Sequence, residues 1–263
     1  MIKQLIANEL HLLSNALIAH ILFSELALCK RKCMYYKISN TAKKEEIESW
    51  TNSVFKYPHL YEPQLLINGL NEVSIPLITM EKPDELALAI WGMLPEKYKE
   101  DWNIFQSATN TLNLHEKLMD SELWYANALK QRRSVIPVTG FFTSFLKDGV
   151  AYPYHISLKS GKPFYLAGVY NILEDGFITC SMLVGKANAF IKKFQNIVDC
   201  MPLIVTTEGK DVWLNKTTPI PKIKEILKSP IANEYQASPI AKELFNNDIT
   251  YDSMLSPYDY DKV

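Results

Sequence analysis

The strongest constraint on the fold is a series of short apolar segments between residues 134 and 183, each ended by a turn signal. The segments are rich in β-branched and aromatic side chains, which favour strands. Two of the breaks, Lys-Asp-Gly at 147–149 and Lys-Ser-Gly-Lys at 159–162, are typical of hairpin turns, because glycine adopts a positive φ angle at little cost. The sequence therefore predicts hairpin-linked strands over 134–145, 151–158, 163–170 and 177–183.

Helical patterns and further strands lie on both sides of this series. Ser39 or Thr41 can cap a helix that runs to about Phe55. The other expected helices cover 122–130, 186–194, 207–214 and 222–227. The other expected strands cover 65–70, 74–80, 86–93 and 202–205. This mixture predicts the α+β class.

The composition fits one folded domain without a strong overall charge. Of 263 residues, 48% are hydrophobic, so the chain can bury one sizeable core. Because 28 Lys and Arg balance 29 Asp and Glu, contact with a phosphate backbone needs a local basic patch. Four cysteines are too few for a disulfide framework, and Cys29 and Cys33 form only a lone C-x3-C pair. We expect a cytoplasmic monomer that holds no metal and no cofactor.

The first 33 residues form a separate, leucine-rich extension. Its longest apolar run, Ala16 to Phe23, is far shorter than the roughly 20 residues that span a bilayer, so no membrane association is expected. The extension is either an amphipathic helix or upstream sequence before a true start at Met34, and we favour the second interpretation. The expected organisation is an extension at 1–33, a domain at 34–217, and a C-terminal helix with a loose tail at 218–263.

Five stretches, in order along the chain, resemble motifs of one protein family. Residues 91–95 (WGMLP) resemble W-G-L-I-P, 110–116 (NTLNLHE) resemble T-L-N-A-R-x-E, and 132–142 (RRSVIPVTGFF) resemble R-R-C-L-I-P-V-T/D-G-F-Y/F. Residues 163–170 (PFYLAGVY) are similar to P-F-A-L-A-G-I-W, and 187–188 (AN) with 199–205 (DCMPLIV) to A-N … x-R-M-P-V-I-L. The chain is identified as a divergent member of the SOS response-associated peptidase (SRAP) family, the abasic-site processing proteins.

The resemblance implies a fold and a mechanism. The fold has mostly antiparallel β-sheets in a barrel-like arrangement, flanking helices and a groove for single-stranded DNA. In the family, a cysteine after the initiator methionine becomes the N-terminus by self-cleavage. Its amine and thiol then condense with the aldehyde of an abasic site to give a thiazolidine crosslink. An N-terminal amine has a pKa of about 7.7–8.0, so part of it is nucleophilic at pH 7.

Family members place an asparagine, a glutamate and a histidine around the cysteine, and most of these positions are substituted here. Asn113 matches the asparagine and either orients the site or serves as a turn residue. Thr143 stands in place of the glutamate and cannot exchange protons as a carboxyl does. Gln195 stands in place of the histidine, or Val198 if the shorter family spacing applies. Cys200 replaces the arginine before Met-Pro and is expected to be buried.

The position of the nucleophile is also changed. The family start M-C-Y-H-I-S aligns without a gap on residues 34–39 (MYYKIS), which puts Tyr35 at the cysteine position. Cys33 lies close by, but its amine is free only if the bond after Lys32 is cleaved. Cys33 and Asn113 are therefore the remaining catalytic candidates, with Tyr35, Thr143 and Gln195 as matched but substituted positions.

We expect contacts with single-stranded, abasic DNA for two reasons. The motifs above match those of the family, and Lys130, Arg132 and Arg133 form a local basic patch. The residues expected to contact DNA are Trp91, Asn113, His115, Arg132 and Arg133. His115 replaces an arginine, and a mostly neutral imidazole cannot make the same bidentate phosphate contact.

The residues leave three classes of function open. The first is a non-catalytic SRAP relative that retains the fold and some DNA binding, which the joint loss of acid, base and nucleophile favours. The alternative is an active SRAP enzyme, self-processed at Cys33, that crosslinks abasic sites. An unrelated thiol hydrolase that uses Cys180 or Cys200 lacks a suitable histidine, since His155 is expected at the edge of the core.

Overall fold

The computed structural model describes residues 34–117, 124–228, 234–243, 255–258 and 260. The expectations for the extension at 1–33, including Cys33, lie outside the described residues. So does much of the C-terminal segment expected at 218–263, of which residues 229–233, 244–254, 259 and 261–263 are not described.

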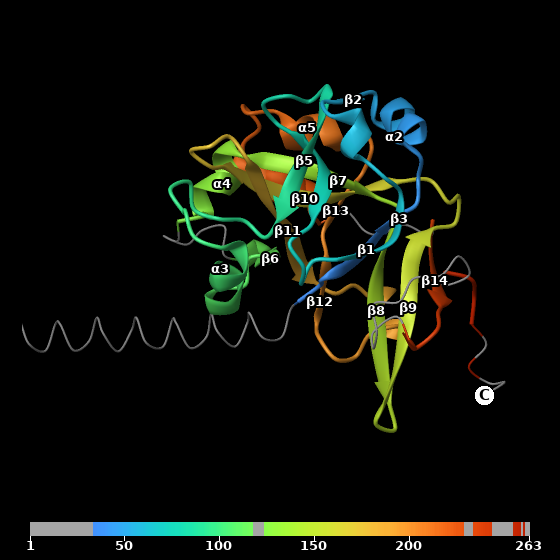
Figure 1. Cartoon of the computed structure of the whole chain (residues 1–263). Helices are drawn as coiled ribbons and strands as arrows, with labels where there is room; N and C mark the ends of the chain where they lie inside the picture. The colour runs from blue at the N-terminus through green and yellow to red at the C-terminus, as the bar shows by residue number, and fades with distance from the viewer. Residues whose placement is uncertain (1–33, 118–123, 229–233, 244–254, 259, 261–263) are drawn as a thin grey trace, which may run out of the picture.

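A closed barrel forms the centre of the molecule (Figure 1). Neighbouring strands pair antiparallel, except that the last one pairs parallel with the first and closes the barrel. In order around the barrel, the strands are β5 (Glu85–Trp91), β4 (Ser74–Thr79), β7 (Arg133–Val138), β10 (Phe164–Ile172) and β11 (Ile178–Lys186). Short strands extend its edges: β2 (Val54–Phe55), β6 (Asn113–His115), β12 (Cys200–Pro202) and β13 (Ile204–Val205).

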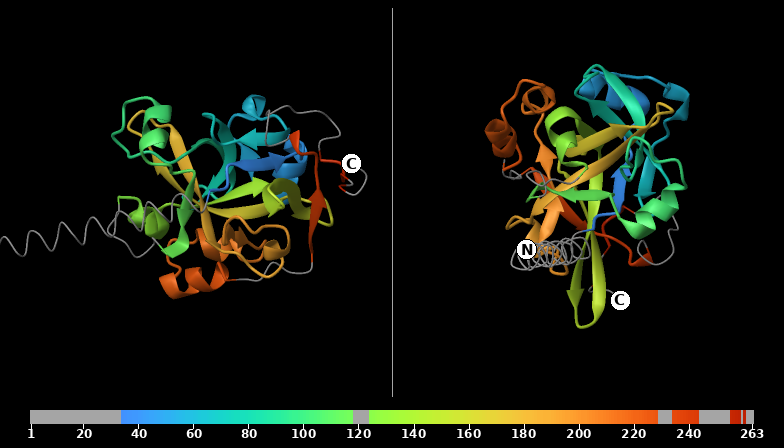
Figure 2. Two further views of the ribbon diagram at one scale, coloured as in Figure 1. Left: turned by 90° about the horizontal axis from the view of Figure 1, so that it is seen from below. Right: turned by 90° about the vertical axis from the view of Figure 1, so that its left-hand side faces the viewer.

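A second sheet packs against the barrel. Its order is β14 (Tyr235–Pro239), β9 (Val150–Leu158), β8 (Gly140–Lys147), β1 (Lys37–Asn40) and β3 (Gln64–Asn68). The long β8–β9 hairpin extends away from the barrel in Figures 1 and 2. The tip of this hairpin turns at Asp148 and Gly149, both with positive φ, as the sequence predicts.

One predicted strand belongs to two sheets. The segment predicted as a single strand over 134–145 is β7 followed by β8, because the chain changes sheets at Thr139. The Thr139 N–H donates to the Ser39 carbonyl at 2.9 Å, and its hydroxyl accepts from the Thr41 N–H at 2.9 Å. These bonds to β1 and the residue that follows it join the barrel to the second sheet.

Short helices cover the outside of the sheets. They are α2 (Lys44–Thr51), α3 (Trp102–Ala108), α4 (Ala126–Gln131), α5 (Lys210–Leu214) and α6 (Ile220–Ile226), with the 3-10 turns η1 (Pro58–Leu60) and η3 (Ile191–Lys193). The prediction of a helix over 186–194 is wrong. β11 continues through Lys186, which pairs with Cys200 of β12, and only one 3-10 turn follows. The predicted α+β class and barrel-like arrangement are confirmed.

Candidate functional site

The matched site positions come together from four separate segments. Tyr35 lies immediately before β1, Asn113 begins β6, Thr143 lies on β8, and Gln195 follows η3. The barrel positions Asn113, because it pairs with Met182 of β11. The second sheet positions Thr143, because β8 pairs with β1 and β9.

Asn113 holds the main chain of Tyr35 from both directions. The Tyr35 N–H donates to Asn113 Oδ1 at 3.0 Å, and Asn113 Nδ2 donates to the Tyr35 carbonyl at 2.7 Å. The carboxamide thus acts on residues 78 positions away in sequence and is not a turn asparagine that bonds its own backbone.

The phenol of Tyr35 fills the space beside Gln195. Tyr35 is only 4% exposed, and its ring packs edge-to-face on Phe141 with centroids 5.8 Å apart. Its hydroxyl donates to Gln195 Oε1 and lies 3.0 Å from the carbonyl oxygen of Cys200. Gln195 Nε2 donates to the carbonyls of Cys200 at 2.6 Å and Val198 at 2.9 Å. Burial raises the pKa of the Tyr35 hydroxyl far above its usual range, so the phenol stays neutral.

Thr143 reaches the same cluster through a neighbour of Gln195. Its hydroxyl donates to the Phe194 carbonyl at 3.2 Å, and Thr143 is 3% exposed. Thr143 and Gln195 therefore support the loop that contains residues 194 and 195. Among the described residues, the side chains that bond Tyr35 are those of Asn113 and Gln195. Both are neutral amides, which cannot act as an acid or a base near neutral pH.

A group of charged side chains lies next to this cluster, where β11 and β6 end and β12 begins. Lys192 Nζ forms an ion pair with Asp199 at 2.8 Å, and this bond is the main cause of the lowered pKa of the Asp199 carboxyl. The charges of Lys186 and Lys117 lower that pKa further, so both ammonium groups lie in the same region. Lys117, Lys186 and Lys192 are exposed and are named here the lysine rim.

No motif in the sequence marks the lysine rim. Its three members span 75 positions, from Lys117 to Lys192. The pairing of β6 and β12 with β11 brings their segments together. His115 lies beside it, paired with Val184, and is half buried. Burial lowers the pKa of the His115 imidazole, so this side chain is mostly neutral at pH 7.

Two of the residues expected to contact DNA lie in the core. Trp91 has no exposed surface, and its indole N–H donates to the Leu112 carbonyl at 2.9 Å. Arg133 is 1% exposed, and its guanidinium donates to four carbonyls, those of Leu129, Lys130, Trp213 and Asn215, at 2.6–3.0 Å. A buried indole cannot stack on a base, and a guanidinium with these bonds cannot bind a phosphate. For Trp91 and Arg133 the structure thus replaces the expected DNA contact with a structural role.

The remaining candidates fall into two groups. Arg132 and Lys130 reach the surface near α4, away from Tyr35. Cys180 is fully buried, which raises the pKa of its thiol, and Cys200 is buried as expected. His155 is buried, and its Nε2 lies 2.8 Å from Ser39 Oγ, which makes it a core residue. Within the part of the chain that the structure describes, no group of three or more metal-ligating side chains occurs.

A match to a known family model identifies the family of this chain. The model of the SOS response associated peptidase (SRAP) family matches residues 28–247. The chain belongs to the SRAP family.

Every helix that the structure describes is too short or too polar to span a bilayer.

Curated relatives of this SRAP protein share a description. The abasic site processing protein YoqW of Bacillus subtilis is 26% identical over 166 residues, which cover 60% of this chain and 71% of YoqW. The abasic site processing protein YobE of Bacillus subtilis is 28% identical over 53% of this chain and 63% of YobE. The abasic site processing protein YMR114C of Saccharomyces cerevisiae is 26% identical over 52% of this chain and 38% of its own length.

Solved structures match the fold. A protein from Bacteroides thetaiotaomicron superposes with a TM-score of 0.76 at 20% identity, over 85% of this chain and all of that chain. A protein from Bordetella bronchiseptica gives a TM-score of 0.65 at 18% identity, over 78% of this chain and 99% of that chain. At these identities the likeness establishes the fold alone.

Proposed function

We propose that this SRAP protein binds single-stranded DNA beside Tyr35 and forms no covalent crosslink with abasic sites. The observation that carries the proposal is the side chain at position 35. A phenol, bonded to Gln195 and to the carbonyl of Cys200, stands where family members have a cysteine. A phenol supplies no thiol, so an imine formed at this residue could not close to a thiazolidine.

The substitutions around Tyr35 fit this loss of chemistry. Thr143 and Gln195 replace the acid and the histidine, and both now form hydrogen bonds that hold the 194–200 segment. Groups that act as a unit in catalysis lose most of their effect when one is removed. Here three have changed together.

Strand binding is supported by the relatives and by the lysine rim. The relatives that match this chain are abasic site processing proteins, whose substrate is DNA. Lys117, Lys186 and Lys192 place three ammonium groups near Asp199, so the charge beside the cluster is positive although the net charge of the whole chain is −1. Lysines in such a position suit the phosphates of a single strand.

The test combines a crosslinking assay with intact mass spectrometry. The full chain is incubated with a fluorescent single-stranded oligonucleotide that contains one abasic site, and a family member that begins Met-Cys is the positive control. We expect no band shift on a denaturing gel and an unchanged protein mass. A covalent adduct would contradict the proposal, and an adduct mapped to Cys33 as a new N-terminus would establish the self-processed enzyme instead.

Binding without chemistry is measured separately. Fluorescence anisotropy with an intact single strand, at low and moderate salt, should show affinity that falls as salt rises, because counterions are released. Absence of salt-sensitive binding at micromolar protein would remove the binding half of the proposal and leave only the lost chemistry.

A further inference from the structure

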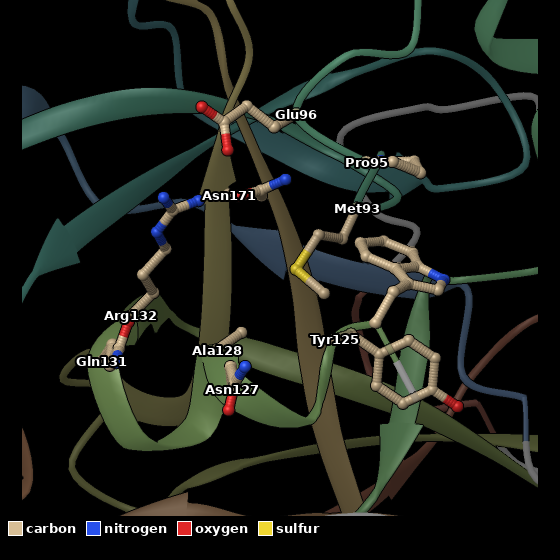
Figure 3. Close-up of a pocket in the computed structure, with 10 residues that line it drawn as sticks. Met93, Pro95, Glu96, Tyr125, Asn127, Ala128, Gln131, Arg132 and Asn171 are labelled. Atoms are coloured by element: carbon tan, nitrogen blue, oxygen red, sulfur yellow. The ribbon is translucent and has the colours of Figure 1, made fainter. Parts of the chain in front are cut away.

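A polar cavity lies between the loop after β5, α4 and β10 (Figure 3). Its volume is about 280 Å³, which is ample for one nucleobase or a molecule of similar size. We propose that this cavity binds a guanine base. The proposal goes beyond strand binding at the lysine rim and does not depend on it.

The two charged residues of the cavity, Arg132 and Glu96, are both attached through their main chains to the β10–β11 hairpin. The Arg132 carbonyl accepts from the Tyr170 N–H at 2.9 Å, and the Glu96 carbonyl accepts from the Glu174 N–H at 3.1 Å. Arg132 also caps α4, since its N–H donates to the Ala128 carbonyl at 2.6 Å. Both main chains are thereby attached to β10 and the turn that follows it, so the two side chains begin from fixed positions.

The charges of Arg132 and Glu96 are available to a ligand. Among the described residues, neither side chain forms an ion pair or a side-chain hydrogen bond. Asn171, which is 8% exposed, lies beside them in Figure 3. Its Nδ2 donates to the Leu94 carbonyl at 2.8 Å, so Oδ1 remains as an acceptor. These three side chains therefore offer one donor fork and two acceptors.

The rest of the lining is mixed, with the carboxamides of Asn127 and Gln131 beside apolar and aromatic side chains. Figure 3 shows the guanidinium of Arg132, the carboxylate of Glu96 and the carboxamide of Asn171 on one side, with the thioether of Met93 and the ring of Tyr125 on the other. Trp124 also lines the cavity and packs edge-to-face on Tyr125 with centroids 5.3 Å apart. A ligand that fits this division is planar, with a polar edge and an apolar face.

Guanine matches this pattern better than the other bases. It has two adjacent acceptors, O6 and N7, that suit a guanidinium fork, and two adjacent donors, N1–H and N2–H, that suit a carboxylate. Adenine puts a donor beside N7, where Arg132 would also place a donor. Cytosine and thymine lack the pair of donors for Glu96. An extruded base is commonly read by such edge contacts between aromatic and apolar side chains.

Isothermal titration calorimetry of the full chain with dGMP, dAMP, dCMP and dTMP tests the proposal, since all four share the same phosphate. We expect dGMP to bind about tenfold or more tightly than the others, the discrimination typical of a bidentate base contact. Glu96→Gln and Arg132→Met should each weaken dGMP binding about tenfold or more. Glu72→Gln and Lys216→Met, at exposed positions outside the cavity, are the matched controls.

Equal binding of the four nucleotides, no binding of dGMP at millimolar concentration, or unchanged affinity in Glu96→Gln would each overturn the guanine site. A second arm identifies the source of the base. Anisotropy is compared between an all-thymidine oligonucleotide and the same strand with one deoxyguanosine. Tighter binding of the second strand assigns the site to a base within DNA, whereas dGMP binding without that gain assigns it to a free nucleotide. Failure of both strands to bind would remove only strand binding at the lysine rim.

Discussion

The carboxamide of Asn113 forms two hydrogen bonds with the main chain of Tyr35, one as acceptor at 3.0 Å and one as donor at 2.7 Å. Neither bond involves the side chain at position 35. Both bonds are therefore available to any residue at position 35, and the side chain there decides only whether a thiol is present.

The first prediction concerns the phenol that fills the site. Tyr35→Phe removes a donor and leaves Gln195 Oε1 buried without that partner, so the free energy of unfolding should fall by about 1–3 kcal/mol. Chemical denaturation followed by tryptophan fluorescence measures the change. Tyr57→Phe, at a position that is 47% exposed, is the control and should alter stability by less than about 0.5 kcal/mol. An unchanged stability in Tyr35→Phe would show that the buried bond is absent in solution.

The second prediction distinguishes two adjacent arginines. Arg133→Met removes four hydrogen bonds to carbonyls that join α4 and α5 to β7, and it should destabilise the fold by about 3 kcal/mol or more. Arg132→Met, whose guanidinium lies at the edge of a cavity, should cost less than about 1 kcal/mol. Thermal unfolding of both variants gives the comparison. Equal losses would contradict the structural role of Arg133.

The third prediction is a pH dependence caused by His155. Burial lowers the pKa of this imidazole to about 4, whereas in the unfolded chain it is about 6.5. Between these values the unfolded state binds more protons, so this contribution to stability is complete above pH 6.5 and is lost as the pH falls toward 4. The loss should be on the order of 2–3 kcal/mol.

Denaturation curves at pH 7 and pH 4.5 measure this contribution. His155→Gln preserves a polar group that can bond Ser39 and removes the titration, so its stability should change less between the two pH values. His59→Gln, at an exposed position, should retain the full dependence of the wild type. If His155→Gln shows the same loss as the wild type, other groups cause the pH dependence.

The fourth prediction concerns the lysine rim. Lys186→Glu and Lys117→Glu should each weaken single-strand binding and lower the slope of log affinity against log salt by about 0.7 for each phosphate that the variant no longer neutralises. Lys216→Glu, which makes the same charge change on an exposed surface after α5, is the control. Anisotropy titrations at three salt concentrations provide the slopes. Equal effects of all three variants would indicate a response to net charge and no specific rim.

Much of the fold could be predicted from local pattern. Alternating apolar segments, with Gly149 and Gly161 at positive φ in the turns, predict β9, β10 and β11 within a few residues. Local pattern failed where pairing partners decide the structure. Lys186 extends β11 because it pairs with Cys200, although the residues after it have helical character. The local pattern does not predict β14, because this segment is a strand only through its pairing with β9.

Motif order and residue type are local properties, so the resemblance to the family and the residue types at positions 35, 143 and 195 can be read without coordinates. The contacts that these three side chains make follow from the tertiary structure. The phenol of Tyr35 bonds Gln195, 160 positions away, and Arg133 and Trp91 lie in the core and not on the surface. Burial and hydrogen bonding depend on which strands become neighbours, and that choice is made by the packing of the whole chain.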